Sequence, residues 1–204
     1  MTRIYPEASW CRYADDGLVH CRSVKEAQEI RLALEARFAE CGLQMHPAKT
    51  KIVYCKDGRR TGTHERTKFT FLGYEFRGRS VKSPKTGDLF TGFAAAVSPA
   101  ALTAMRQKAR RLYYRRRTDL NLQDIATKLN PILRGWIAYY GRFQPSALCP
   151  LFRYIGNSLA AWAMRKYKRF RRSKMRAAGF INQVCQKCPE LFAHWKLRTA
   201  GAFA

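Results

Sequence analysis

The chain has 204 residues, 47% of them hydrophobic and 13% aromatic, which excludes a disordered basic tail and predicts one large or two small packed domains. Its 39 Lys and Arg residues outnumber 14 Asp and Glu, giving a formal net charge of +25. Residues 101–204 hold 22 basic and 3 acidic side chains, against 17 and 11 in residues 1–100. The second half above all therefore indicates a densely anionic partner, most simply nucleic acid.

Other features argue against a membrane or secreted protein. The basic residues are interleaved with Tyr and Trp, no apolar run is long enough to span a bilayer, and no secretory signal precedes the first expected strand. The seven scattered cysteines predict reduced thiols in the cytoplasm. Cys185 and Cys188 have zinc-ligand spacing, but only His194 lies near them and structural zinc needs four ligands, so we expect no metal there.

The first expected element is a hairpin that carries two adjacent carboxylates. Short apolar runs at residues 10–13 and 18–21 read as strands, and Asp16-Gly17 is a strong turn signal between them. Asp15 and Asp16 would then lie together at a solvent-exposed tip. Such a pair fits an ordinary surface turn, and it also fits a site beside a divalent cation.

The remainder of the first half predicts a helix and further strands. A capping box at Ser23–Glu26 opens a helix with one apolar stripe, which Gly42 closes, so we expect this helix to lie on a sheet. Residues 52–55 and 69–76 read as strands, and Gly73 marks a bulge or a close backbone approach. Residues 77–97 predict a loop or short hairpin that leads to a domain boundary.

From Ser98-Pro99 onward the pattern is helical. Helices are expected from residue 99, over 122–140 with an interruption at Asn130-Pro131, over about 147–169, and around Ile181. Helical spacing places Tyr114 on one face of the first of these helices with Arg106, Arg110 and Arg117. The fold class is therefore α+β, with an α/β part at 1–97, a basic all-helical part at 98–180 and a C-terminal helical tail at 181–204.

Four ordered motifs carry a family resemblance. They are Arg12–Asp16, the segment from Gly42-Leu43 through His46-Pro47 to Lys49–Lys51, Phe71–Tyr74, and Gly135-Trp136 with Tyr139–Gly141. In this order and spacing the chain resembles group II intron-encoded reverse transcriptases/maturases, RNA-directed DNA polymerases of a mobile element that also assist RNA splicing. The resemblance covers nearly the whole chain.

The resemblance implies a partial polymerase palm, an antiparallel sheet with the carboxylate hairpin and one packed helix, followed by a helical thumb/maturase domain. Asp15 and Asp16 would be catalytic and would bind Mg²⁺ in a two-metal site. The residues implied for the primer grip and the template-primer contact are Lys49, Phe71, Leu72, Gly73 and Tyr74. Implied partners are intron RNA and a DNA or RNA primer-template, in a cytoplasm of bacterial type.

The basic helical part supplies the expected nucleic-acid-binding residues, because few acids are present to pair with them. These residues are Arg106, Arg110, Arg111, Arg115, Arg116, Arg117, Arg134, Tyr139, Tyr140, Lys166, Lys168 and Arg169. A solvated helix face and a frayed basic helix end are the plain alternatives. The two tyrosines could stack on unpaired bases or belong to the core.

Only twelve residues precede Tyr13, so we expect this chain to lack the fingers and the third catalytic carboxylate. Three functions then stay open: a polymerase part that acts with an N-terminal half from another chain, a non-catalytic RNA-binding splicing cofactor, and a folded remnant without a selected role. An uncovered sheet edge also favours self-association.

Overall fold

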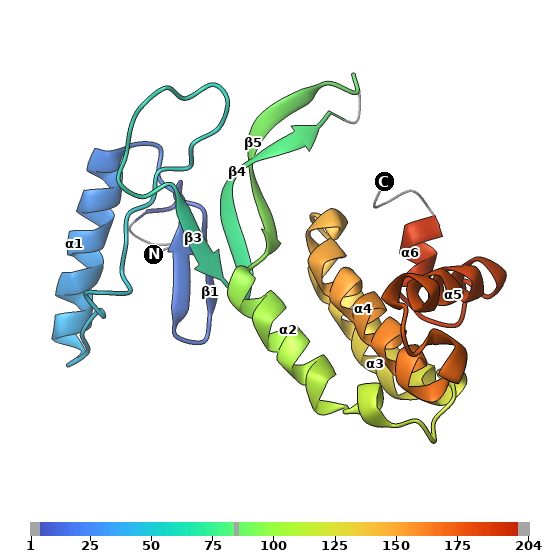
Figure 1. The fold of residues 1–204 in the computed structure, drawn as a ribbon. Helices are drawn as coiled ribbons and strands as arrows, with labels where there is room; N and C mark the ends of the chain where they lie inside the picture. The colour runs from blue at the N-terminus through green and yellow to red at the C-terminus, as the bar shows by residue number, and fades with distance from the viewer. Residues whose placement is uncertain (1–4, 84–85, 200–204) are drawn as a thin grey trace. The chain divides into compact units, whose positions relative to one another are not determined.

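The computed structural model describes residues 5–83 and 86–199, which form two compact units. The N-terminal unit comprises the residues up to Phe71 together with Arg77–Phe93. The helical unit comprises Leu72–Phe76 and the residues from Ala94 onward. Their elements are mixed α/β, with small antiparallel sheets and a helical second half, so the α+β fold class is confirmed (Figure 1).

The carboxylate hairpin forms from β1 (Trp10–Tyr13) and β2 (Asp16–Val19), but its turn is not where the sequence predicted. Tyr13 pairs with Asp16, so the connecting residues are Ala14 and Asp15. Ala14 takes a φ of +53°, and its carbonyl accepts a 2.7 Å hydrogen bond from the Arg12 side chain. Positive φ at the first central residue suits a two-residue hairpin turn, and Gly17 is left inside β2.

Helix α1 (Val24–Glu40) begins at the predicted N-cap, but only half of the predicted capping box forms, because the Glu26 carboxylate accepts a 2.6 Å hydrogen bond from the Arg22 N–H instead of the Ser23 N–H. The Ser23 side chain accepts a hydrogen bond from the Glu26 N–H, and Gly42 closes the helix with a φ of +68°. Only Ile30 of its apolar stripe is buried, while Phe38 stays exposed. The expected burial of this face is therefore only partial within the described residues.

A second sheet has the order β3 (Lys68–Phe71), β4 (Tyr74–Lys82), β5 (Leu89–Val97). The single strand expected over residues 69–76 is wrong. Leu72 and Gly73 have φ values of +50° and +80°, which make a tight hairpin turn between β3 and β4. Within the segment 77–97, for which a loop or short hairpin was expected, residues 77–82 continue β4 and residues 89–97 form β5, so most of the segment is long strand.

The expected strand at residues 52–55 does not form. Tyr54 donates a 2.9 Å hydrogen bond to the Arg66 carbonyl, but the Lys56 N–H turns back to the Tyr54 carbonyl. This local turn interrupts the extended pairing that a strand needs.

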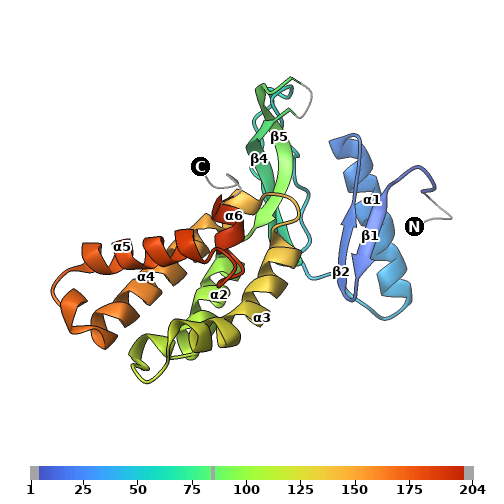
Figure 2. The same ribbon diagram turned by 90° about the vertical axis from the view of Figure 1, so that its right-hand side faces the viewer.

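The helical unit has a continuous apolar core. Its elements are α2 (Pro99–Arg111), the 3₁₀ helix η1 (Tyr114–Arg116), α3 (Leu122–Tyr140), η2 (Pro145–Leu148), α4 (Cys149–Lys166), η3 (Lys168–Phe170), α5 (Lys174–Lys187) and α6 (Trp195–Thr199). Helices α4 and α5 lie side by side in both views (Figure 1, Figure 2). Trp162 of α4 and Phe192 are among the largest fully buried side chains.

Two helix predictions in this unit need correction. Helix α3 continues through Pro131, because Leu129 and Leu133 on either side of it are fully buried in the core. Packing of this face outweighs the hydrogen bond that the proline removes. Helix α4 stops at Lys166 because Tyr167 is extended, with φ −109° and ψ 116°.

No helix in the part of the chain that the structure describes is both long and apolar enough to cross a bilayer.

Candidate nucleic-acid-binding site

The carboxylate hairpin presents both of its acids to solvent. Asp15 lies in the turn and Asp16 is the first residue of β2, and both side chains are exposed. Neither carboxylate is buried against apolar side chains, so the location is open to a charged ligand.

The turn between β3 and β4 packs against the end of α3 within the helical unit. The Tyr139 hydroxyl donates a 3.0 Å hydrogen bond to the Leu72 carbonyl, and the Tyr74 hydroxyl donates to the Tyr139 carbonyl. A Cβ added at Gly73 would lie 2.6 Å from the Tyr140 hydroxyl oxygen. The close backbone approach predicted at Gly73 is confirmed, and Tyr140 is its cause.

Aromatic rings surround this turn. Tyr74 has ring centroids 5.3 Å from both Tyr139 and Tyr140 and 5.4 Å from Phe143. Burial raises the pKa of the Tyr74 and Tyr140 hydroxyls above their ordinary values. Tyr139 and Phe143 keep 47% and 60% of their surface exposed, so part of the cluster remains open to a planar ligand.

The five expected primer-grip residues are divided between the units. Leu72, Gly73 and Tyr74 form the turn on α3, whereas Phe71 ends β3 in the N-terminal unit. Lys49 is an exposed turn residue of that unit, and its N–H donates to the His46 carbonyl at 3.1 Å. The primer-grip role of these residues stays a prediction.

The expected cations of α2 and η1 are mostly exposed. Arg106 is half-buried, while Arg110, Arg111, Arg115 and Arg116 are open to solvent. Tyr114 does not share their face as predicted, because α2 ends at Arg111 and the chain then turns. Tyr114 is instead buried at 3% exposure, and burial raises its pKa to about 12.

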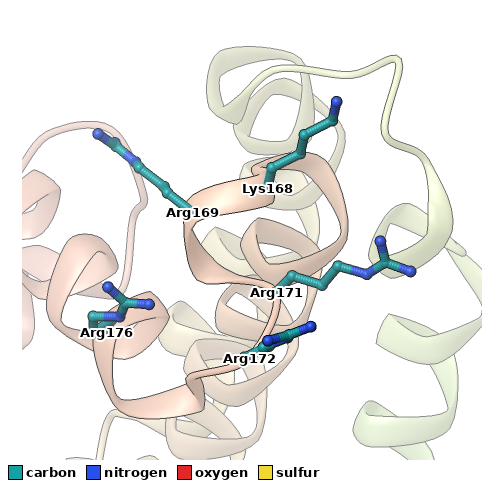
Figure 3. Close-up of a pocket in the computed structure, with 5 residues that line it drawn as sticks. All are labelled: Lys168, Arg169, Arg171, Arg172 and Arg176. Atoms are coloured by element: carbon teal, nitrogen blue, oxygen red, sulfur yellow. The ribbon is translucent and has the colours of Figure 1, made fainter.

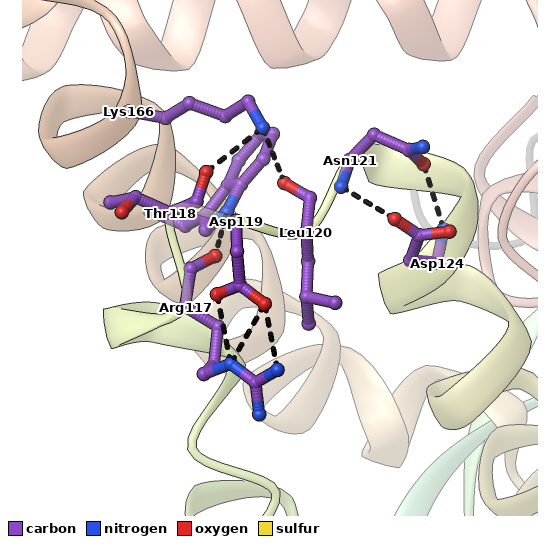
Figure 4. Close-up of polar contacts among 8 residues, drawn as sticks. Arg117, Thr118, Asp119, Leu120, Asn121, Asp124 and Lys166 are labelled. Carbon is purple, nitrogen blue, oxygen red and sulfur yellow. Dashed lines mark hydrogen bonds and ion pairs between the residues drawn. The ribbon is translucent and has the colours of Figure 1, made fainter.

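Two other expected cations hold the loop between η1 and α3 (Figure 4). Arg117 donates to both carboxylate oxygens of Asp119, and these hydrogen bonds lower the pKa of Asp119 to about 2. The Lys166 ammonium donates to the carbonyls of Thr118 at 3.0 Å and Leu120 at 2.7 Å. Both cations are therefore engaged within the fold.

The remaining expected cations lie on two other helical segments. Arg134 is exposed on α3, and Lys168 and Arg169 are exposed on η3. The latter two lie beside cations that the predicted site left out, and together they surround an open hollow of 380 Å³ (Figure 3). We call this group the basic turn: Lys168, Arg169, Arg171, Arg172 and Arg176.

Each half of the chain contains a segment that matches a known protein family. Residues 1–76 match the family described as Reverse transcriptase (RNA-dependent DNA polymerase), and residues 102–178 match the Group II intron, maturase-specific domain. The chain belongs to the group II intron reverse transcriptase/maturase family. A search of curated proteins found no match.

The two family matches divide the candidate residues. The reverse transcriptase match contains the carboxylate hairpin and the turn at Leu72–Gly73. The maturase-specific match runs from α2 into α5 and contains the exposed cations of α2 and η1 as well as the basic turn. The nucleic-acid-binding prediction therefore falls largely on the maturase-specific domain.

No metal site is shown in the described residues. This family uses divalent metal ions, and carboxylate oxygens such as those of Asp15 and Asp16 suit Mg²⁺. No group of three or more His, Cys, Asp or Glu side chains that could hold a metal ion occurs among residues 5–83 and 86–199.

Proposed function

We propose that the helical unit binds intron RNA and a DNA or RNA primer-template through the exposed cations of α2 and η1. The supporting observation is the fate of the three acids in residues 101–204. Asp119 pairs with Arg117, Asp124 caps α3, and Glu190 pairs with Lys196. Since each of these carboxylates already has a partner, none of the three is free to neutralise the exposed arginines of α2 and η1, which therefore suit backbone phosphates.

The binding test replaces Arg110, Arg111, Arg115 and Arg116 together by Ala. If the wild type contacts some six to ten phosphates, its affinity for intron RNA falls about 10³- to 10⁵-fold between 50 and 200 mM salt. The quadruple variant should bind more weakly, with a salt slope lower by about 3 to 4. Fluorescence anisotropy over a salt series measures both quantities.

A matched control removes the same charge elsewhere on this unit, at the exposed residues Lys128, Arg153, Arg165 and Lys187. Its salt slope should change much less than that of the α2–η1 variant. Equal losses in the two variants, or a flat salt response of the wild type, would contradict the proposed interface.

RNA-directed DNA synthesis is the proposed activity when fingers and a third carboxylate are supplied by another chain. Asp15 and Asp16 would then contribute two of the Mg²⁺ ligands. Asp15→Ala should abolish primer extension in the complemented mixture, because a carboxylate of the metal site is lost, while RNA binding stays within about twofold of wild type. Extension that survives Asp15→Ala unchanged would remove the hairpin from the proposal.

A non-catalytic splicing cofactor is the second candidate, favoured by the incomplete donor set of the described residues. This function needs the cations of the helical unit but not Asp15. Splicing of the bound intron should then tolerate Asp15→Ala and fail with the Arg110/Arg111/Arg115/Arg116 variant. The bacterial cytoplasm is the proposed location, which suits the seven free cysteines.

A further inference from the structure

The basic turn places five positive charges around one open hollow in the helical unit. Lys168 and Arg169 belong to η3, Arg171 and Arg172 follow it, and Arg176 lies in the first turn of α5. The extended residue Tyr167 ends α4, and the Ser173 side chain then caps α5 by accepting from the Arg176 N–H. These two local events fold the basic run back on itself and bring Arg176 beside it.

Nothing acidic balances this group. Residues 125–189 contain no Asp or Glu, and the flanking acids Asp124 and Glu190 are engaged with Asn121 and Lys196. All five side chains are exposed, and no ion pair involves them in the described part of the chain. Like charges held this close repel each other, so a bound polyanion would lower the free energy of the turn.

The side chains of the basic turn extend to two sides. In Figure 3, the Lys168, Arg171 and Arg172 side chains extend toward one side and the Arg169 side chain toward the other, and Arg176 lies on the side of Arg169. The Arg169 guanidinium packs against two aromatic rings. Its central carbon lies 4.6 Å from the Phe170 ring centroid and 5.6 Å from the Phe180 ring centroid. Such stacking fixes the direction of a charge that would otherwise sample many rotamers.

This arrangement differs from the cations of α2 and η1. Those residues belong to two consecutive helical segments, α2 and η1, which are joined at Leu112 and Tyr113, and we expect them to contact phosphates of a single backbone. Charges that fan out to both sides of one tight turn can contact two separate backbone segments at once. Straight duplex RNA offers its phosphates along regular strands, whereas a junction or sharp bend brings distant segments together.

We propose that the basic turn bridges two backbone segments of folded RNA and so discriminates RNA junctions from straight duplex. The inference rests on the proposed RNA binding by the helical unit and assigns the recognition of folded structure to one part of it. The N-terminus of α5, which begins at Lys174 inside the group, adds partial positive charge for the same phosphates.

The test uses the whole chain, a three-way-junction RNA and a straight duplex RNA of equal nucleotide count. One variant, Arg171→Gln with Arg172→Gln, neutralises one side of the turn, and Arg176→Gln neutralises a charge on the other side. Arg169 is left intact because it packs on aromatic rings. The control, Lys128→Gln with Arg153→Gln, removes two exposed charges from α3 and α4.

Wild-type protein should bind the junction at least about tenfold more tightly than the duplex. Each side variant alone should remove most of this preference, and combining them should add little, because a bridge fails when either end is lost. The control should weaken both RNAs equally and keep the preference. Circular-dichroism melting verifies that every variant is folded, and Arg171→Gln alone replaces the double variant if that one is not.

Two results would overturn the inference: wild-type protein without a junction preference, or side variants that weaken junction and duplex binding in parallel. Failure of the proposed function itself looks different. In that case neither RNA binds in a salt-dependent manner and the α2–η1 variant has no effect.

Discussion

At the scale of single residues, Gly73 combines two structural requirements, a positive φ and a close approach to a neighbouring side chain. Its φ of +80° is strained for any residue with a side chain, and a Cβ there would meet the Tyr140 hydroxyl at 2.6 Å. Gly73→Ala should therefore lower the free energy of unfolding by about 2 to 4 kcal/mol, combining left-handed backbone strain with overpacking. Chemical denaturation followed by tryptophan fluorescence measures the loss.

The double variant Gly73→Ala with Tyr140→Phe separates these two causes. It removes the hydroxyl that the new methyl group would strike but keeps the backbone strain, so about half of the lost stability should return. Tyr140→Phe alone serves as the reference. A Gly73→Ala protein as stable as wild type would mean that the turn does not pack on α3 in this way.

At the scale of elements, the sequence correctly predicted where a helix begins when one capping residue decides that position. Ser23 and Ser98 are the N-caps predicted from their identity and position, because a side-chain oxygen satisfies a backbone N–H locally. Asp16-Gly17 misled, since the hairpin turns at Ala14-Asp15, with positive φ at an alanine. The break at Leu72–Gly73 was missed because leucine rarely adopts the positive φ that ends β3 there.

For the candidate site as well, features that one residue decides were predicted, and features that depend on where a helix ends were not. The exposed cations of α2 and η1 were identified from charge alone, since an arginine without nearby acids stays in solvent. Tyr114 was misplaced because helical spacing was extended beyond Arg111, where the helix ends. Arg176 was missed because its proximity to Arg169 depends on the chain reversal between α4 and α5, which begins at Tyr167, inside the segment that was expected to stay helical to about residue 169.

At the scale of the whole molecule, the two units bury apolar surface very differently. The helical unit encloses a large core, whereas the N-terminal unit leaves many large apolar side chains exposed, namely Trp10, Tyr13, Val24, Leu32, Phe38, Leu43, Leu89 and Phe90. The carboxylate hairpin forms only a two-stranded sheet, an arrangement that is marginally stable by itself in water. The N-terminal unit is therefore the part of the chain that most needs a covering partner.

We predict concentration-dependent self-association of the isolated chain through this exposed apolar surface. Leu32→Glu on α1, where the leucine is 58% exposed, should reduce both the association seen by sedimentation velocity and the binding of an apolar dye. Met175→Glu on α5 is the matched control, because that methionine is 84% exposed in the helical unit and its change should leave association intact.

A fragment that carries the upstream palm strands should compete with self-association, since both would cover the same apolar surface. A chain that sediments as a monomer at all concentrations, with little dye bound, would show that the N-terminal unit needs no such cover. The proposed complementation by another chain would then have to rest on the metal-binding proposal for Asp15 and Asp16 alone.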